Sequence, residues 1–495
     1  MSHKLSKSTF MRGVKCTKCL YLNKHHNELR DQMSEQQAAI FQQGTDVGEL
    51  AQQLYPYGID LTPESYYNFA PSIKATQEAI SRGENVIYEA AFQHNGVLAA
   101  MDILVRSDNG YKAYEVKSST SVKPTYVQDG ALQAHVIMGS GVILEDISIV
   151  HLDNSYKKEG NIDIHGLFKT VSILDAIQPY LSKVPEQITG FKHVLTGNSS
   201  PEIPIGPHCT SPYSCDFMGH CWKNVPEYSV FDIANLSGPR KFELYRKGIV
   251  TLDQIPATEK LSANQRIQVD AEVNSRMYID KEKINSFLDE LIYPLCFLDF
   301  ETMAFAVPQI EQSSPYQPIV FQYSLHTLMN KESELEHFEF LAPADGNDPR
   351  LAFIERLMEQ CGTEGDILVY NISFEKRMLK GLALLFPQHK ETIDGIISRL
   401  KDLIIPFQKK WYYTPEMRDS ASLKSVYPAL FSDQNNGYAA LNIHDGGMAS
   451  MVYAQMFDGS YTKDYECART DLLAYCKLDT LALVKLLEKL YEATN

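Results

Sequence analysis

The 495-residue sequence has no run of about 18 apolar residues, the length that a membrane-spanning helix needs. Its start, residues 1–13, also lacks the apolar core of a signal peptide. We therefore expect a protein that does not enter a membrane and is located in the cytoplasm. Internal repeats and low-complexity runs are absent as well. At this length the chain should fold as two to four domains, which have to be found from its motifs.

Positive charge is in the minority, with 46 Lys and Arg against 62 Asp and Glu and a formal net charge of −16. This balance argues against a protein that coats nucleic acid by charge alone. It is compatible with an enzyme that holds phosphates locally through metal ions and basic grooves. The first 27 residues depart from the average, because no acid precedes Glu28. This stretch is either a solvated basic tail or an edge that contacts phosphates, and its basic residues are Lys4, Lys7, Arg12, Lys15, Lys18 and Lys24.

A short apolar run that begins at Leu295 presents two acids one residue apart, Asp299 and Glu301. Successive side chains of a β-strand point to opposite faces, so both carboxylates project from one face and Phe300 turns away into a core. Two acids side by side on a buried strand repel each other, and a divalent cation such as Mg²⁺ removes that repulsion. The pattern therefore indicates a metal site, with a strand bearing two solvated acids as the alternative.

A second acidic pair is predicted on a β-hairpin. Two β-rich runs, residues 97–106 and 111–117, flank an Asp-Asn-Gly turn. A turn centred on residues 108 and 109 places Asp102 directly opposite Glu115, where like charges destabilise a sheet. A metal ion between the two acids would remove that penalty. Lys117 shares the face of Glu115 and is placed to neutralise charge on a phosphate or to orient the attacking water.

Together with the downstream Gln133, these residues resemble the PD-(D/E)XK nucleases of the RecB type. The resemblance implies that Asp102 and Glu115 hold Mg²⁺ or Mn²⁺ and that Lys117 stabilises developing charge. One position departs from the family. Residues 36–55 have a helical apolar pattern, and Gly48 stands where the helix of the family often carries a His. Glu49 either compensates for that loss, or the first site is slow or restricted in its choice of metal.

The nine cysteines are unevenly distributed. In a cytoplasmic protein, clustered cysteines suggest metal binding rather than disulfides. Five of the nine fall in two groups, Cys16 with Cys19 and Cys209 with Cys215 and Cys221. These five resemble the cysteines of RecB-type nucleases that contain an iron–sulfur cluster, a group that includes CRISPR-adaptation nucleases and AddB-type helicase–nucleases. This resemblance implies a 4Fe–4S cluster held by Cys16, Cys209, Cys215 and Cys221, with Cys19 as a spare ligand and zinc as the alternative metal. We expect the four single cysteines to be small core residues, namely Cys296, Cys361, Cys467 and Cys476.

The C-terminal half extends the Asp299–Glu301 motif. A second strand is predicted at residues 366–370, followed by Glu375, and residues 471–487 have the pattern of an amphipathic helix on which Tyr475 and Asp479 share one face. The ordered set resembles the DnaQ-like DEDD exonucleases of the Tyr subtype. Asp402 and Ser422-Leu423-Lys424 stand where that superfamily has further signals. Glu375 departs from the usual Asp by one methylene group.

These resemblances imply an α/β multidomain protein. Its expected parts are a PD-(D/E)XK, restriction-endonuclease-like domain at residues 1–226, a helical connector at 227–290, and an RNase H-like DEDD exonuclease domain at 291–495. The connector is either a helix–hairpin–helix-like module or a plain spacer.

The expected function is metal-dependent hydrolysis of phosphodiester bonds in nucleic acid, with DNA favoured over RNA and single-stranded ends as the substrate. In the second site two metal ions would be held by Asp299, Glu301, Glu375 and Asp479, and Tyr475 would orient the water. The alternatives are a nucleic-acid-binding scaffold with decayed sites and a zinc-stapled protein that binds other proteins.

Overall fold

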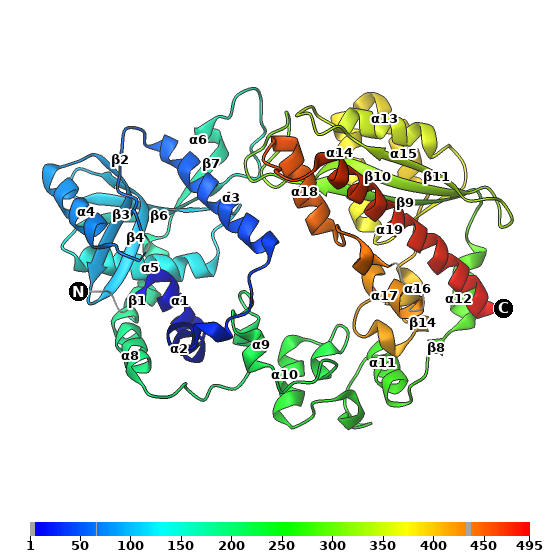
Figure 1. The fold of residues 1–495 in the computed structure, drawn as a ribbon, viewed down its shortest axis with the longest axis horizontal. Coiled ribbons are helices and arrows are strands. Elements are labelled where there is room, and N and C mark those ends of the chain that lie inside the picture. The colour runs from blue at the N-terminus through cyan, green and yellow to red at the C-terminus, as the bar shows by residue number, and fades with distance from the viewer. Residues whose placement is uncertain (1–4, 66, 432–436) are drawn as a thin grey trace. The chain divides into compact units, whose positions relative to one another are not determined.

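A computed structural model of the chain describes residues 5–65, 67–431 and 437–495. The fold is mixed α/β, and the chain divides into two compact units. Figure 1 shows the elements of both units, coloured by position along the sequence. The first unit comprises Met1–Asn224 together with Phe305–Gln317, and the second comprises Val225–Ala304 with Pro318–Asn495. Residues 227–290, expected to be a separate connector, lie within the second unit. Among the described helices, none has the length and apolar character needed to cross a membrane.

The first unit is built on a seven-stranded sheet in the order β2-β3-β4-β5-β6-β7, with β1 paired to β4. The hairpin of β4 and β5 confirms the expected register, because Ile103 pairs with Tyr114 and Arg106 with Tyr111. A second hairpin joins β3 to β4 through Asn95 and Gly96. The strands are β1 (Leu5–Ser6), β2 (Ile59–Asp60), β3 (Val86–His94), β4 (Val97–Arg106), β5 (Tyr111–Lys117), β6 (Leu144–Leu152) and β7 (Phe168–Ser172).

Helices cover both faces of this sheet. Residues of α5, α1 and α8 pack with one face in a core that includes Leu132, Phe10 and Phe191. The other face is covered by α3, which confirms the expected helix, through Val47 and Ala51. The helices of the unit are α1 (Lys7–Lys15), α2 (Thr17–His25), α3 (Glu35–Ala51), α4 (Ala70–Arg82), α5 (Pro124–Gly139), α6 (Ile164–Leu167), α7 (Leu174–Leu181), α8 (Val184–Thr196) and α9 (Met218–Cys221).

Residues 305–317 complete the core on the α3 side. They connect β9 to β10 of the second unit in sequence, yet they belong to the first unit. Ala306 is 3% exposed within that core. The Tyr316 hydroxyl lies 2.5 Å from Ser118 Oγ and donates to the Ser118 carbonyl at 3.0 Å. Since Ser118 follows Lys117 directly, this segment supports the end of the strand that carries Glu115 and Lys117.

The second unit contains a five-stranded sheet in the order β11-β10-β9-β12-β13. Its first three strands are antiparallel, and β12 is parallel to both β9 and β13. A separate two-stranded ribbon pairs β14 with β8. The strands are β8 (Tyr278–Ile279), β9 (Leu295–Met303), β10 (Ile319–Leu328), β11 (Glu336–Leu341), β12 (Asp366–Val369), β13 (Leu400–Asp402) and β14 (Tyr412–Tyr413).

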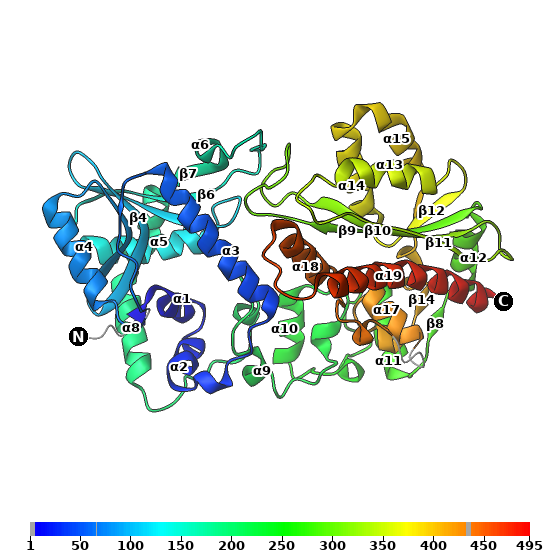
Figure 2. The same ribbon diagram turned by 45° about the horizontal axis from the view of Figure 1, so that its top comes forward.

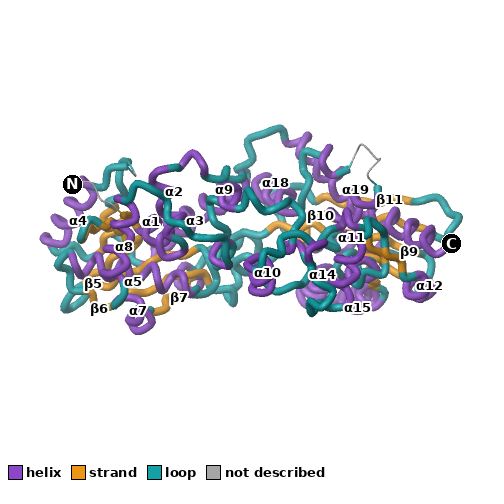
Figure 3. The backbone as a smooth tube through the Cα atoms, turned by 90° about the horizontal axis from the view of Figure 1, so that it is seen from below, coloured by secondary structure: helices purple, strands orange, loops and turns teal. Residues whose placement is uncertain are grey.

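The five-stranded sheet lies between two helical layers (Figure 2). Helices α13, α14 and α15 pack on the face to which Phe300 turns, and the long helix α19 packs on the opposite face. Figure 3 shows the strands of both units with helices beside them. The helices are α10 (Gly238–Arg246), α11 (Ala263–Val273), α12 (Lys281–Asp289), α13 (Arg350–Gln360), α14 (Ile372–Leu385), α15 (Lys390–Ser398), α16 (Ile405–Gln408), α17 (Leu423–Leu430), α18 (Gly446–Asp458) and α19 (Tyr465–Thr494).

The residues expected to form a connector have a small core of their own, in which Leu244 of α10 and Val269 of α11 pack with Val230, Ile233 and Leu252. Buried side-chain amides reinforce this core. Gln268 accepts from the Ala234 N–H at 2.9 Å and donates to the Asp232 carbonyl at 2.7 Å. This part of the chain is therefore helical, as expected, and its helices pack together in a core of their own.

We predict that Tyr316→Phe destabilises the first unit by about 1–2 kcal/mol, because it removes a hydroxyl that serves two partly buried groups of Ser118. The sequence offers a clean probe, since it has 2 tryptophans and only Trp222 lies in the first unit. Urea unfolding followed by Trp222 fluorescence in a Trp411→Phe background measures the change. Tyr57→Phe is the matched control, because Tyr57 is 100% exposed. Equal stability of the two variants would contradict the prediction.

Candidate functional sites

The first site is a row of carboxylates across three neighbouring strands. The β4–β5 pairs follow the expected register as far as Ile103 and Tyr114, and Asp102 and Glu115 are the next residues on the two strands. On the other side of β4, Tyr88 pairs with Ile103 and Ala90 with Met101. Glu89 of β3, which has a positive φ of 52°, and Asp102 lie between these two pairs, where the ladder is interrupted, and their charges interact. Glu89 is a site residue that the sequence analysis missed. The Asn95-Gly96 turn was the available signal, because a two-residue turn there fixes the β3–β4 register.

Two lysines balance this row. Lys117 Nζ lies 2.5 Å and Lys7 Nζ 2.6 Å from the same oxygen, Glu115 Oε1. Gln133 of α5 donates to the other oxygen, Glu115 Oε2, at 2.6 Å. The structure thus brings together Asp102, Glu115, Lys117 and Gln133, and it adds Lys7 from the start of α1. The Val116 N–H donates to Asp102 Oδ2 at 2.6 Å, which fixes that carboxylate beside the strand.

The electrostatics of the row differ from strand to strand. Burial would raise the pKa of Glu115, but the ammonium groups of Lys117 and Lys7 lower it to about 2. Burial and the neighbouring Glu115 raise the pKa of Asp102 to about 7. Burial and the charges of Asp102 and Glu115 raise the pKa of Glu89 to about 8. For two of the three acids the protein therefore does not fully stabilise the ionised form, and a bound cation would do so.

Asp129 of α5 is a further acid at this site. Its Oδ2 lies 3.5 Å from Lys117 Nζ and 3.7 Å from Lys7 Nζ. Asp129 Oδ1 and Gln133 Oε1 are both buried and have no hydrogen-bond partner among the described residues. Free buried oxygens next to a charged carboxylate suit a cation or its bound water, because an unsatisfied buried acceptor costs free energy.

The helix position that departs from the nuclease family is open. A Cβ atom at Gly48 would meet no atom within 4 Å among the described residues. Glu49, its neighbour on α3, is exposed. Glu49 therefore does not compensate by reaching into a buried site, and the acids of the row come from strands and from α5.

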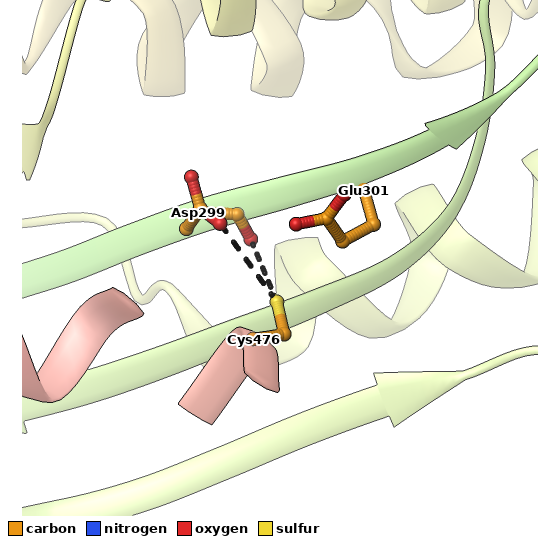
Figure 4. Close-up of side chains that lie close together, drawn as sticks. All are labelled: Asp299, Glu301 and Cys476. Atoms are coloured by element: carbon orange, nitrogen blue, oxygen red, sulfur yellow. Dashed lines mark hydrogen bonds between the residues drawn. The ribbon is translucent and has the colours of Figure 1, made fainter. Parts of the chain in front are cut away.

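The second site begins on β9. Asp299 and Glu301 project from the same face of the strand, as expected, and Cys476 of α19 faces them (Figure 4). One ligand atom from each of the three residues lies within 4.8 Å of the others. The Cys476 thiol is within hydrogen-bonding distance of the Asp299 carbonyl at 3.8 Å and of Asp299 Oδ2 at 3.9 Å. Cys476 was expected to be a plain core residue; it is buried, but it also borders the carboxylates.

Helix α19 supplies the remaining expected groups. Asp479 and Tyr475 are both buried, at 5% and 3% exposure, and a hydrogen bond joins them. Lys424 of α17 donates to the Tyr475 hydroxyl at 2.7 Å. The Tyr438 hydroxyl donates to Asp479 Oδ1. Tyr438 was not predicted from the sequence, because it follows a polar stretch that carries no motif.

Glu375 lies near the start of α14, and Asp402 of β13 positions that helix. The Asp402 carboxylate accepts from the backbone N–H groups of Asn371 and Ile372, each at 3.0 Å. An acid at a helix N-terminus satisfies otherwise unpaired N–H groups and interacts well with the helix dipole. Glu375 is 2% exposed, and its Oε2 has no partner among the described residues. Asp402 therefore has a structural role, and Glu375 retains a free oxygen.

Uncompensated negative charge is greater in the second site than in the first. Burial, followed by the charges of Asp479, Glu301 and Glu375, raises the pKa of Asp299 well above its usual range, and Lys424 opposes this effect. Burial and Asp479 raise the pKa of Glu301 in the same way. Burial raises the pKa of Asp479 to about 6 and that of Glu375 to about 8. Such a set of buried acids is suited to divalent cations.

The clustered cysteines form a third candidate site, in the first unit. All five of them, Cys19 included, line one small hollow between α2 and the segment from Ile203 to Cys221. Cys19 is more buried than Cys16, and a hydrogen bond with Cys19 lowers the pKa of Cys215 to about 6. Five converging thiols fit a thiolate-bound metal centre and leave either Cys16 or Cys19 as its N-terminal ligand.

Of the four single cysteines, Cys296 and Cys361 are core residues, as expected. Cys467 is exposed, so the expectation of a core residue was wrong there. Its position near the start of α19 lies outside the buried face of that helix.

We predict that Glu375→Gln changes how the stability of the second unit depends on pH when EDTA is present. The folded protein holds the Glu375 proton up to about pH 8, whereas an unfolded Glu loses it near its usual pKa of about 4.3. Stability from this group is therefore fully present below about pH 4.3 and is lost as the pH rises through 8. Between these two pH values, the free energy of unfolding of the variant should rise relative to that of the parent by about 1 kcal/mol per pH unit.

Urea unfolding followed by Trp411 fluorescence at pH 5.5, 6.5 and 7.5, in a Trp222→Phe background, measures this difference. Glu364→Gln is the control, because Glu364 is an exposed acid of the same unit. A constant difference between Glu375→Gln and the parent across this range would contradict the prediction.

Comparison with known proteins gives similarity without an assigned activity. A family model described as a domain of unknown function (DUF2779) matches residues 296–422, which include Asp299, Glu301 and Glu375 but not Tyr475 or Asp479. The chain is 25% identical to the uncharacterized protein MG366 homolog of Mycoplasma pneumoniae over 217 residues, which are 41% of this chain and 33% of that protein. It is 24% identical to the uncharacterized protein UU173 of Ureaplasma parvum over 288 residues, 53% of this chain and 40% of that protein. The chain thus spans well under half the length of these relatives.

Proposed function

We propose that the protein is a divalent-metal-dependent nuclease with two hydrolytic sites. The observation that carries the proposal is the second site, where acids from β9, α14 and α19 come together with a tyrosine in a buried setting. Their charge calls for cations that a phosphodiester substrate would share. The substrate we favour is DNA, cut at single-stranded ends.

In the second site, Asp299, Glu301, Glu375 and Asp479 would hold the metal ions. Two divalent ions there would stabilise the attacking and leaving oxygens of the phosphodiester. Tyr475 would orient the attacking water through its hydroxyl, which has hydrogen bonds with Lys424 and Asp479. Tyr438 fixes Asp479 by a hydrogen bond. These positions support a DEDD-type exonuclease of the Tyr subtype.

In the first site, Asp102 and Glu115 would hold Mg²⁺ or Mn²⁺, with Glu89 and Asp129 near enough to contribute. Lys117 would stabilise the negative charge that develops on the phosphate. Gln133 fixes Glu115 by its side-chain amide. The three-strand row with a lysine two residues after the last acid supports a PD-(D/E)XK-type nuclease.

The sheets are compatible with this assignment. The second unit has three antiparallel strands followed by two parallel ones, with the acidic strand β9 at the centre, and this favours an RNase H-like fold. In the first unit the acids lie on the antiparallel hairpin next to the parallel pair β5–β6, and this favours a restriction-endonuclease-like core.

For the cysteine hollow we propose a 4Fe–4S cluster held by Cys16, Cys209, Cys215 and Cys221, with zinc as the alternative. The cluster would cross-link α1 and α2 to the segment that ends the first unit's main stretch of chain. Its role would be to stabilise the unit.

We predict that the protein degrades end-labelled single-stranded DNA in the presence of Mn²⁺ or Mg²⁺, with one polarity from each site. Asp299→Asn should lower the rate of cleavage from one end of the strand by at least about 10²-fold, and Lys117→Ala should lower the rate from the other end by as much. Each change removes a group that acts on the transition state. The double variant should be inactive. Denaturing gels of 5′- and 3′-labelled DNA, with labelled RNA in parallel, make the measurement.

Asp419→Asn and Lys112→Ala serve as controls, because Asp419 and Lys112 are exposed residues outside both carboxylate sites. Absence of any cleavage by the parent protein would refute the catalytic proposal and favour a binding scaffold. Loss of both polarities from Asp299→Asn alone would reduce the first unit to a binding module.

We predict that protein purified without oxygen is brown and absorbs near roughly 400 nm, as thiolate-bound iron–sulfur clusters do. Cys209→Ser should remove this absorbance and lower the stability of the first unit, read by Trp222 fluorescence, because the cross-link is lost. Cys19→Ser should keep the absorbance. A colourless parent that contains zinc would assign the hollow to zinc. If Cys19→Ser loses the colour and Cys16→Ser keeps it, the N-terminal ligand is Cys19 rather than Cys16.

A further inference from the structure

Lys7 lies at the first carboxylate site although it is more than 80 residues from the other groups in sequence. Its Nζ contacts Glu115 Oε1 at 2.6 Å and stands 3.7 Å from Asp129 Oδ2. Two carboxylates, those of Glu115 and Asp129, thus lie beside this ammonium group. The ammonium group is therefore charged in this setting. The basic start of the chain was expected to be either a solvated tail or an edge that contacts phosphates. Lys7 does not lie in a solvated tail.

Three sets of contacts fix helix α1, which begins at Lys7. Ser6 caps the helix by a reciprocal pair of hydrogen bonds with Thr9. Phe10 is 1% exposed and packs edge-to-face on Phe191 of α8 at 5.2 Å. Arg12 pairs with Asp216 at 2.8 Å, next to Cys215. A helix anchored in the core and in the cysteine segment places the Lys7 backbone firmly and leaves the side chain, which is 30% exposed, free to change its partner.

The contacts of Glu115 pose a physical conflict. Lys7 and Lys117 both contact Glu115 Oε1, and Gln133 contacts Glu115 Oε2. A divalent cation that binds Glu115 would lie a few ångströms from two ammonium groups, and like charges at that distance repel strongly in a partly buried site. Lys117 is held on the same strand as Glu115. Lys7 comes from another element and has the flexible four-carbon stem of a lysine, so it is the group that can move away.

We propose that Lys7 is a second cationic group of the first site, which neutralises Glu115 while no divalent cation is bound and transfers to a phosphate oxygen of the substrate when one is. This rests on the proposed function of the first site, and it names the ligand of Lys7 as a phosphodiester. The ammonium group competes with the metal ion for Glu115. The negative charge of Glu115 is therefore balanced both with and without a bound metal ion.

Direct binding of Mn²⁺, followed by the free-ion signal in electron paramagnetic resonance, tests the competition without any nuclease activity. The parent carries Asp299→Asn and Glu301→Gln, so that the first site dominates the titration. Lys7→Met should bind Mn²⁺ at least about fivefold more tightly than this parent, because one competing charge is gone. Lys7→Arg should stay near the parent. Lys24→Met is the matched control, since it removes an exposed lysine from the same basic stretch, and it should change nothing.

Cleavage of single-stranded DNA in the same background tests the transfer to phosphate. Lys7→Met should lower kcat by on the order of 10²-fold, the cost of removing one charge stabiliser from a reacting phosphate. Lys7→Arg should recover most of that loss, and Lys24→Met should cleave like the parent. Trp222 fluorescence of each variant shows whether the first unit is folded.

The outcomes separate the inference from the proposed function. If the parent cleaves nothing, the proposed activity of the first site fails, and the Mn²⁺ affinities alone decide the counter-cation role of Lys7. Unchanged Mn²⁺ affinity in a folded Lys7→Met variant, or weaker binding, overturns the inference. Tighter Mn²⁺ binding with unchanged cleavage overturns the transfer to phosphate, and tighter binding with slower cleavage supports the inference as a whole.

Discussion

The constraint that governs this protein is the burial of like charges on adjacent strands. Glu89, Asp102 and Glu115 come from three neighbouring strands and interact through their charges, and the pairing of β9 with β10 puts Asp299 and Glu301 on one face of β9. Each carboxylate taken out of water costs free energy, and each neighbouring carboxylate adds to that cost. The sheets can carry these rows only because large apolar cores on both faces offset the penalty.

The two units meet this constraint differently. In the first, two lysines and an amide surround Glu115, so that the central charges are largely balanced within the protein. In the second, Lys424 is the cation that opposes the charges around Asp299, and its hydrogen bond goes to Tyr475 rather than to a carboxylate. The second site therefore depends more on bound cations for its stability. The first can remain folded and balanced without them, at the cost of a competition for Glu115.

Short-range rules predicted the parts of these sites that depend on a single strand or turn. The Asp-Asn-Gly turn gave the correct register of β4 and β5, and the alternation of a strand gave the shared face of Asp299 and Glu301. The same rule applied to the Asn95-Gly96 turn would have found Glu89. Lys7, Asp129, Tyr438 and the approach of Cys476 depend on how distant elements pack, and no local pattern encodes that. The catalytic roles themselves rest on resemblance and remain predictions.

The limits of the first unit show the same difference between local and long-range information. The composition of the sequence changes near residue 226, and a boundary placed there leaves out residues 305–317, which the structure assigns to the first unit. Without them, the α3 side of its sheet would lack Ala306, and Ser118 would lose its contacts with Tyr316. A segment that closes a core from so far along the chain adds a large loop-closure cost, which only its burial and hydrogen bonds repay. Since Ser118 adjoins Lys117, the first carboxylate site depends on a segment that connects the strands β9 and β10 of the second unit. Residues 1–226 alone would therefore present the site with its supporting layer incomplete.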